Sequence, residues 1–260
     1  MSVRKLALIT GSTSGIGLAI AETFARQGIE VILHGLESVQ EGEALSARFA
    51  QEFGARPHYF QCDLSQPEAI EQLMQRISQE AGDPSILVNN AGIQFTAPVQ
   101  EFPPQTWDKI IAINLSAAFH TTRLALPGMI QAGWGRVINI ASVHGLVASE
   151  HKAAYCAAKH GLVGFTKVTA LETAAQGITA NCICPGWADT PLLVEQFENF
   201  AKENNTSYEE AKRGLINAKA PYPDFVAPEA IGELALFLCS DAAKAITGTA
   251  LPIDGGWTAH

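Results

Sequence analysis

Short apolar segments alternate with segments of helical periodicity along this chain, and no other feature restricts its fold as much. A strand that is apolar at every position has both faces buried, which is typical of a parallel sheet covered by helices. The sequence therefore predicts an α/β fold, a doubly wound parallel sheet of about seven strands. The segments that we expect to form these strands are 5–10, 29–34, 58–62, 86–89, 136–141, 178–184 and 250–253.

The segments between the strands carry helix signals. After the first strand, Ile16, Ile20 and Phe24 recur at four-residue spacing, and Gly28 follows as a helix-terminating residue. No linker or internal repeat divides the 260 residues, so we expect one domain over residues 1–260. Further helices are expected over about 38–53, from Pro67 onward, over about 106–131 and over about 153–176.

One segment, residues 187–220, interrupts the alternation. It is rich in polar and charged residues and follows directly after the strand expected at 178–184. Doubly wound sheets bind ligands at the carboxyl ends of their strands, so we interpret this insertion as a lid over a binding site. A surface excursion or a contact between subunits is the alternative interpretation.

Composition and charge exclude several classes of function. The net charge of −9 leaves no basic excess to neutralise nucleic-acid phosphates. The apolar run before Gly11 is too short for a secretory signal, and no run reaches membrane-spanning length. The five cysteines include no C-x-x-C pair, so we expect reduced thiols, no metal site and a cytoplasmic protein.

A glycine-rich segment, 10–17, joins the first strand to the first helix. It reads Thr-Gly-Ser-Thr-Ser-Gly-Ile-Gly, a Gly-x-x-x-Gly-x-Gly spacing. Glycines allow a tight turn and a close approach of the backbone to a pyrophosphate, which then lies at the helix N-terminus. Because the segment lies between a strand and a helix, it predicts a dinucleotide site and hence a Rossmann fold, although a tight turn alone can use such glycines.

The residues after the second strand bear on which nicotinamide cofactor binds. Neither 12–14 nor 34–38 contains an Arg or Lys that could bind a 2′-phosphate, which favours NAD over NADP. Glu37 is a candidate ribose ligand, although it comes late after the strand. Asp63 can contact the adenine or cap the next helix.

Tyr155 and Lys159 are four residues apart on a predicted helix and therefore share one face. A free tyrosine has a pKa of about 10, and a nearby ammonium favours its phenolate, which can act as a base. Alone, such a pair is usually a solvated helix face. Ser142 ends a buried strand upstream, where its hydroxyl can hold a substrate oxygen, so we interpret the three residues as a catalytic group.

Asn114 is a polar residue in an otherwise apolar stretch of a predicted helix. It can hydrogen-bond neighbouring backbone, as buried amides commonly do. Alternatively, it can hold a water molecule that connects Lys159 to solvent in a proton relay.

Together these motifs resemble the short-chain dehydrogenase/reductase family over essentially the whole chain. The resemblance rests on 10–17, 89–92, Asn114, Ser142, the Tyr155-x-x-x-Lys159 pair and Pro185-Gly186. It implies a catalytic tetrad of Asn114, Ser142, Tyr155 and Lys159, hydride transfer between a substrate carbon and a nicotinamide, and a homotetramer. It also implies that Thr190 contacts the carboxamide of the cofactor. The other expected cofactor contacts are Gly11, Thr13, Ser14, Gly15, Ile16, Gly17, Leu36, Asp63, Leu64, Asn90, Ala91, Gly92, Tyr155, Lys159, Pro185, Gly186 and Trp187.

Several stretches are similar to the D-3-hydroxybutyrate dehydrogenases of this family. They are 90–94, 141–149, 183–187 and 254–259. The similarity implies that a small carboxylate is held by the residues at four positions and that two tryptophans wall the pocket. These residues are Gln94, His144, Lys152 and Gln196, with Trp187 and Trp257, beside Ser142 and Tyr155.

The position of Lys152 supports a carboxylate substrate independently. Lys152, Tyr155 and Lys159 fall at i, i+3 and i+7, so the first can share the helix face of the catalytic pair. A cation near the reacting centre suits an anionic substrate. Each substrate residue also has an ordinary structural interpretation, namely a solvated helix start for Lys152, a core imidazole for His144 and a surface amide for Gln196.

The sequence thus predicts NAD-dependent oxidation of (R)-3-hydroxybutyrate to acetoacetate, with the reverse reduction, in ketone body metabolism. An NADPH-dependent reductase of 3-oxoacyl thioesters is the nearest alternative, but it would need an open, basic groove. A nicotinamide-binding regulator without catalysis is a second alternative, against which the complete tetrad counts.

Overall fold

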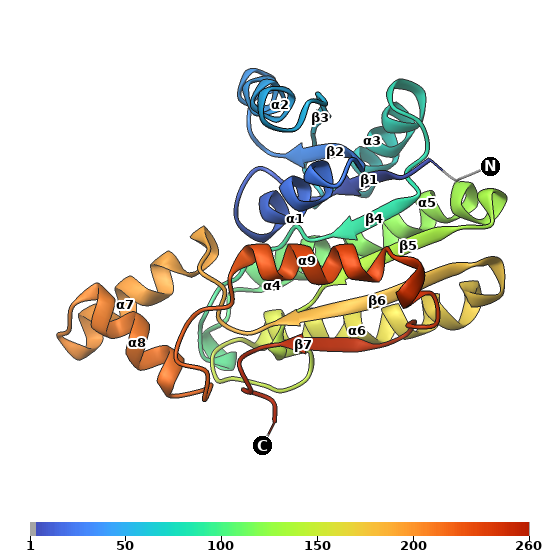
Figure 1. Ribbon diagram of the computed structural model, residues 1–260. Coiled ribbons are helices and arrows are strands. Elements are labelled where there is room, and N and C mark those ends of the chain that lie inside the picture. The colour runs from blue at the N-terminus through green and yellow to red at the C-terminus, as the bar shows by residue number, and fades with distance from the viewer. Residues whose placement is uncertain (1–3, 260) are drawn as a thin grey trace.

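The computed structural model describes residues 4–259, which form one parallel sheet with helices on both faces (Figure 1). All six strand pairings are parallel, and the strand order is β3-β2-β1-β4-β5-β6-β7. The predicted doubly wound fold and its seven strands are confirmed, with bounds within about two residues of those expected. The strands are β1 (Leu6–Ile9), β2 (Glu30–Gly35), β3 (His58–Gln61), β4 (Ile86–Asn89), β5 (Gly135–Ile140), β6 (Ile178–Pro185) and β7 (Ala250–Ile253).

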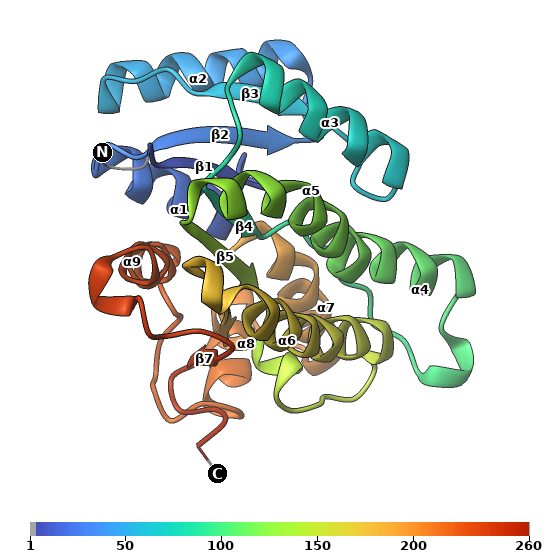
Figure 2. The same ribbon diagram turned by 90° about the vertical axis from the view of Figure 1, so that its right-hand side faces the viewer.

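Two apolar clusters hold the helices against the two faces of this sheet. One cluster contains Phe24, Phe49 and Ile231, and the other contains Ile77 and Met129. In Figure 2 the helices α1 and α9 lie on one side of the sheet, and α3, α4, α5 and α6 lie on the other. The helices are α1 (Gly15–Arg26), α2 (Val39–Phe53), α3 (Pro67–Glu80), α4 (Pro104–Ile111), α5 (Ala117–Ala132), α6 (Ala153–Thr173), α7 (Val194–Asn204), α8 (Tyr208–Asn217) and α9 (Pro228–Leu238).

The strand order reverses between β1 and β4. From β1 the chain moves outward to β2 and β3, and it then returns to place β4 on the other side of β1. The loops that leave β1 and β4 therefore diverge at their carboxyl ends and open a crevice between them. Open α/β sheets bind ligands at this position.

The helix expected over 106–131 is interrupted, contrary to the sequence prediction. It begins at Pro104, and a five-residue π-helical turn, Ala112–Ser116, separates α4 from α5. Such turns often occur at functional sites because they rotate one side chain away from the regular helical position. Here the turn carries Asn114, whose side chain is bonded to the backbone of Ile93.

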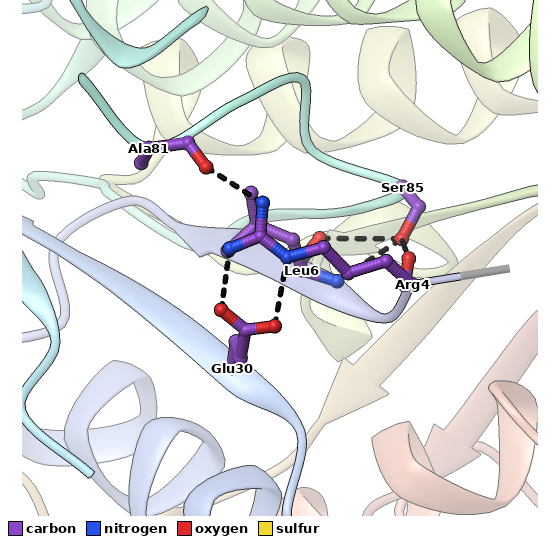
Figure 3. A network of polar contacts seen from close by, with 5 residues as sticks. All are labelled: Arg4, Leu6, Glu30, Ala81 and Ser85. Carbon is purple, nitrogen blue, oxygen red and sulfur yellow. Dashed lines mark hydrogen bonds and ion pairs between the residues drawn. The ribbon is translucent and has the colours of Figure 1, made fainter.

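The opposite, amino-terminal edge of the sheet is closed by a polar network around Arg4 (Figure 3). The guanidinium forms an ion pair with Glu30 at the start of β2 and donates a 2.9 Å hydrogen bond to the carbonyl oxygen of Ala81. Ser85 donates to the Arg4 carbonyl oxygen and accepts from the Leu6 amide. The ion pair is half exposed, so it contributes little stability, but the network connects the starts of β1, β2 and β4.

The glycine turn depends on close backbone contact at Gly17. A Cβ atom at this position would lie 2.1 Å from the carbonyl oxygen of Gly11 and 2.4 Å from the side-chain nitrogen of Asn90. Gly17 therefore cannot carry a side chain unless the turn before α1 moves.

We expect Gly17→Ala to lower the thermal unfolding temperature and to weaken nicotinamide cofactor binding, because the added methyl group displaces the turn. Gly214→Ala, on the exposed face of α8, is the matched control, since its new Cβ meets nothing closer than 3.7 Å. Differential scanning calorimetry and cofactor titration measure both effects. Equal behaviour of the two variants would contradict the assigned role of Gly17.

Candidate active site

A cavity of about 460 Å³ lies at the carboxyl ends of the central strands. It runs from the glycine turn, past Tyr155 and Lys159, to Lys152 and the two tryptophans. The structure therefore brings most of the sequence-predicted site residues to one continuous space. The predicted residues that line it are Gly11, Thr13, Ser14, Gly15, Ile16, Leu36, Asp63, Leu64, Asn90, Ala91, Gly92, Gln94, Ser142, His144, Lys152, Tyr155, Lys159, Pro185, Gly186, Trp187, Thr190 and Trp257.

Two predicted residues, Gly17 and Asn114, do not line this cavity. Gly17 lies behind the turn, against Gly11 and Asn90, where its absent side chain permits close packing. Asn114 lines a small neighbouring cavity of about 10 Å³ together with Lys159. The side chain of Gln196 lies outside the described residues.

The glycine turn has the backbone geometry that a bound pyrophosphate requires. Gly11 and Gly15 adopt left-handed conformations, with φ of 61° and 54°, which residues with a side chain rarely adopt. The amide nitrogen of Asn90's side chain donates 2.9 Å hydrogen bonds to the carbonyl oxygens of Thr10 and Gly11. These two carbonyl oxygens have hydrogen-bond partners within the protein. The N-terminus of α1 beside them is a position that favours an anionic group.

His34, which the sequence analysis did not assign to the site, supports the same turn. Its Nδ1 accepts a 3.1 Å hydrogen bond from the Gly11 amide, so Nε2 carries the proton and donates to the Cys62 carbonyl oxygen at 3.1 Å. Burial lowers the pKa of His34 to about 4, which keeps the ring neutral and Nδ1 free to accept. His34 thus connects the ends of β1, β2 and β3.

Glu37, the candidate ribose ligand that comes late after the second strand, also lines the cavity. One carboxylate oxygen accepts a 2.8 Å hydrogen bond from the Thr13 hydroxyl, and the other is buried without a partner among the described residues. A Cβ atom on Gly35 would lie 2.1 Å from that second oxygen, so the glycine makes room for the carboxylate. An acceptor with spare capacity at this point fits a ribose hydroxyl.

Asp63 lines the cavity and does not cap the next helix, because the N-cap of α3 is Gln66 and has no side-chain hydrogen bond. The Asp63 carboxylate instead accepts a 2.9 Å hydrogen bond from the Ser65 amide. That local bond is the main reason that the pKa of Asp63 is lowered, so the residue stays charged beside the cavity.

Tyr155 and Lys159 are almost completely buried. Lys159 Nζ lies 5.6 Å from the centre of the Tyr155 ring and donates a 2.7 Å hydrogen bond to the carbonyl oxygen of Ile140, the last residue of β5. The carbonyl holds the ammonium on the side of the cavity that Tyr155 and Ser142 share.

The expectation that the pKa of Tyr155 is lowered from its usual value is wrong. Burial raises the pKa of Tyr155 to about 12, and the hydrogen bond with Ser142 opposes this shift only in part. Burial also lowers the pKa of Lys159 to about 8. Removal of both groups from water favours their uncharged forms, and this effect exceeds their mutual attraction.

Asn114 faces the pair from the neighbouring side. Its side-chain oxygen accepts from the Ile93 amide and its nitrogen donates to the Ile93 carbonyl oxygen, both at 2.9 Å. The backbone interpretation of this residue is therefore confirmed. The small cavity that Asn114 and Lys159 both line has about the space of one water molecule, as the relay interpretation of Asn114 requires.

The far end of the cavity combines one buried cation with aromatic walls. Lys152 Nζ lies 5.6 Å from the Trp187 ring centre and donates a 3.4 Å hydrogen bond to the Gln94 side chain. Trp187 and Trp257 pack with ring centres 5.5 Å apart. Burial lowers the pKa of Lys152 to about 8, so the ammonium still predominates at neutral pH.

His144 lies between Ser142 and the wall of the cavity. Strand β5 ends at Ile140 and does not reach His144, which lies in a 3-10 turn, Val143–Gly145. The turn nevertheless leaves His144 Nδ1 3.3 Å from Ser142 Oγ. Burial and the charge of Lys152 lower the pKa of His144 to about 3, so the ring is neutral.

The segment between β6 and α9 projects beyond the carboxyl ends of the strands, where α7 and α8 lie side by side (Figure 1). A 2.8 Å hydrogen bond from the Val226 amide to the Trp187 carbonyl oxygen closes its base. Lys212 on α8 forms an ion pair with Asp189, next to Thr190, and its Nζ lies 4.8 Å from the Phe225 ring centre. The insertion predicted from the sequence is thus a helical pair adjoining the substrate end.

The described residues contain no group of three or more His, Cys, Asp or Glu side chains placed to hold a metal ion. No helix within residues 4–259 is long and apolar enough to cross a membrane. Three of the cysteines, Cys182, Cys184 and Cys239, are buried, while Cys62 and Cys156 are partly exposed.

Comparisons with known proteins agree with this geometry. Residues 11–258 match the family model described as enoyl-(acyl carrier protein) reductase. The chain is 54% identical over 98% of both chains to a D-beta-hydroxybutyrate dehydrogenase from Cupriavidus necator, and 45% identical to one from Rhizobium meliloti over 98% of this chain and 99% of that protein. A crystal structure of an actinorhodin polyketide ketoreductase with NADPH superposes with a TM-score of 0.92 at 34% identity, covering 100% of both chains.

Proposed function

The chain belongs to the short-chain dehydrogenase/reductase family, and from this premise we propose that it oxidises (R)-3-hydroxybutyrate to acetoacetate with NAD and catalyses the reverse reduction. Its similarity to two D-beta-hydroxybutyrate dehydrogenases over nearly the full chain supports this reaction. A reductase of 3-oxoacyl thioesters is less favoured, since the relatives of that activity are more distant, for example 33% identical to the enzyme from Aquifex aeolicus.

The observation that carries the substrate assignment is the buried ammonium of Lys152. It shares the cavity with Ser142 and Tyr155, and the surrounding walls are the rings of Trp187 and Trp257. A substrate carboxylate at this position would form a charge-assisted hydrogen bond with the ammonium. We therefore place the substrate carboxylate at Lys152 and Gln94, with His144 and Gln196 as the further contacts that the family resemblance implies.

The residues of the cavity fit a nicotinamide dinucleotide. The left-handed glycines can take the pyrophosphate, Asp63 and Leu64 the adenine end, and Asn90 to Gly92 with Thr190 the nicotinamide end. When bound, the nicotinamide exchanges a hydride with the carbinol carbon of the substrate.

Ser142 and Tyr155 act on the reacting oxygen. In oxidation, the Tyr155 oxygen accepts the proton of the substrate hydroxyl, while Ser142 holds the same oxygen by a hydrogen bond. In reduction, the Tyr155 hydroxyl donates its proton to the ketone oxygen. Because burial favours the phenol form of Tyr155, the proton needed for reduction is already on this residue, and oxidation requires an acceptor that removes it.

We assign the role of that acceptor to Lys159. Its pKa, lowered to about 8, lets part of Lys159 exist as the neutral amine at mildly alkaline pH, and this amine accepts the phenol proton that Tyr155 must lose before it takes the proton of the substrate hydroxyl. A water molecule in the small cavity beside Asn114 would receive this proton and pass it toward solvent. Lys159 is also the residue that would hold the nicotinamide ribose.

The preference for NAD is proposed from Glu37. A carboxylate that lines the cavity beside Thr13 repels a 2′-phosphate and can accept from ribose hydroxyls. The described part of the adjoining loops, 12–14 and 34–38, contains no Arg or Lys that would compensate.

A homotetramer in the cytoplasm is proposed from the family resemblance. The exposed large apolar side chains Phe119 on α5 and Val168 and Leu171 on α6 agree with it, because a subunit contact would remove them from water. The α7–α8 pair is proposed to act as a lid, since it adjoins the end of the cavity that holds Lys152.

Tyr155→Phe is expected to lower kcat by a factor of at least about 10³, because the loss removes the group that carries the reacting proton. Cofactor affinity should remain within about threefold, since the ring stays in place. Steady-state kinetics and cofactor titration measure both quantities, with the half-exposed Tyr222→Phe as control. Turnover near that of the unaltered enzyme would rule out the assignment.

Lys152→Met is expected to raise the KM for acetoacetate about 10-fold or more, the scale of a lost hydrogen bond to a charged group. The KM for the methyl ester of the same acid should change little, because the ester carries no charge. Lys244→Met, on an exposed lysine, is the control. An equal effect on acid and ester would show that Lys152 does not bind the carboxylate.

Glu37→Gln is expected to lower the NAD-to-NADP ratio of kcat/KM about tenfold, because it removes the charge that repels the 2′-phosphate. Initial rates with each cofactor, using the (R)- and (S)-hydroxy acids, measure cofactor and substrate preference together. Glu52→Gln on the exposed face of α2 is the matched control. An unaltered ratio in Glu37→Gln would remove the basis of the NAD proposal.

A further inference from the structure

A chain of hydrogen bonds extends from Ser142 to Ser149. Ser142 lines the cavity beside Tyr155, its Oγ lies 3.3 Å from His144 Nδ1, and His144 Nε2 lies 2.9 Å from Ser149 Oγ. Ser149 is not among the residues expected at the site, and it does not line the cavity. It follows the 3-10 turn that carries His144 and precedes α6.

The imidazole ring of His144 has little freedom to turn. It packs edge-on against Tyr155 and Trp257, with ring centres 5.9 Å and 5.5 Å away. Both ring nitrogens have serine hydroxyls as neighbours, and the ring is neutral because burial lowers its pKa to about 3. One ring nitrogen therefore donates a hydrogen bond and the other accepts one. The ring thus connects the two serines so that all hydrogen bonds of the chain run the same way.

The choice between the two tautomers of His144 decides whether the Ser142 hydroxyl can donate a hydrogen bond to the reacting oxygen. The Ser142 oxygen already accepts a 3.2 Å hydrogen bond from the backbone amide of His144. If Nδ1 carries the imidazole proton, Nδ1 donates to the same oxygen, and the single proton of Ser142 is left for the reacting oxygen. If Nε2 carries it, Nδ1 competes for that proton, and Ser142 can only accept.

A reacting oxygen that develops negative charge needs a donor, so the Nδ1–H tautomer is the productive one. That tautomer leaves a lone pair on Nε2, which requires a donor of its own. The Ser149 hydroxyl is at hydrogen-bond distance from Nε2, and at 2.9 Å this contact is the shorter of the two that the ring makes with serines.

We propose that Ser149 is a positioning residue, which donates to His144 Nε2 and thereby directs the hydroxyl proton of Ser142 toward the reacting oxygen. This inference deepens the proposed function and rests on it for the identity of the reaction, but not for the identity of the acid. It assigns both ring nitrogens of His144 to serines, so the contact of His144 with the substrate carboxylate implied by the family resemblance would be one of packing and not a hydrogen bond.

Ser149→Ala tests the proposal against a purely structural role. We expect kcat to fall about fivefold to tenfold, the scale of one hydrogen bond lost in the transition state. The fall should be the same for acetoacetate and for its methyl ester, while the KM for the acid changes by less than about twofold. Ser149→Thr, which retains the hydroxyl, should restore most of kcat, and Ser240→Ala, far from the cavity, should have no effect.

Histidine tautomers provide a readout that does not depend on the substrate. In ¹⁵N-labelled protein, we expect His144, assigned by comparison with His144→Gln, to carry its proton on Nδ1. In Ser149→Ala its nitrogen signals should move toward a mixture of tautomers, and Ser149→Thr should resemble the unaltered protein. These spectra test the proposal even if another hydroxy acid proves to be the substrate.

Any one of several results would overturn the proposal. Among them are an unchanged kcat in Ser149→Ala, an increase in the KM of that variant confined to the acid, and an Nε2–H tautomer of His144 in the unaltered protein. A Ser149→Thr variant as slow as Ser149→Ala would have the same meaning, because it would show that the hydroxyl is not what matters.

Discussion

The rest of the site depends on the burial of Tyr155 and Lys159 on one face of α6. Desolvation shifts the two pKa values apart, downward for the lysine and upward for the tyrosine, and in both cases it favours the uncharged form. The Lys159 side chain is held in place by the hydrogen bond that it donates to the carbonyl oxygen of Ile140 at the end of β5. The same strand end leads into Ser142, so the sheet that buries the lysine also positions the substrate hydroxyl.

Much of the fold could be predicted because parallel strands are buried on both faces and are therefore apolar at every position. The strand at 86–89 was predicted to the residue, and Gly28 and Pro67 marked helix boundaries correctly. The interruption at Ala112–Ser116 could not be predicted, because each of its residues is compatible with a regular helix. It is set by a tertiary contact, the paired hydrogen bonds between Asn114 and the backbone of Ile93.

The proximity of Ser142, Tyr155 and Lys159 in one cavity could be predicted because these residue types occur in a fixed order, with the last two on one helix face. His34 could not, since its role requires three separate segments to meet at Gly11, His34 and Cys62. Glu37 was visible as a candidate, but its position in the cavity depends on the space left by Gly35. The pKa of Tyr155 was predicted in the wrong direction because sequence spacing reveals the neighbouring charge and not the depth of burial.

The helical pair α7–α8 is attached to the sheet through a narrow neck. The chain leaves at Trp187 and returns at Val226, and a single backbone hydrogen bond joins these two points. Residues gained or lost beyond the neck would leave the register of β6 and β7 unaltered. Changes of length in the α7–α8 pair can therefore alter how Phe197 packs against Trp187, while the strand ends that lead into the glycine turn and Ser142 keep their positions.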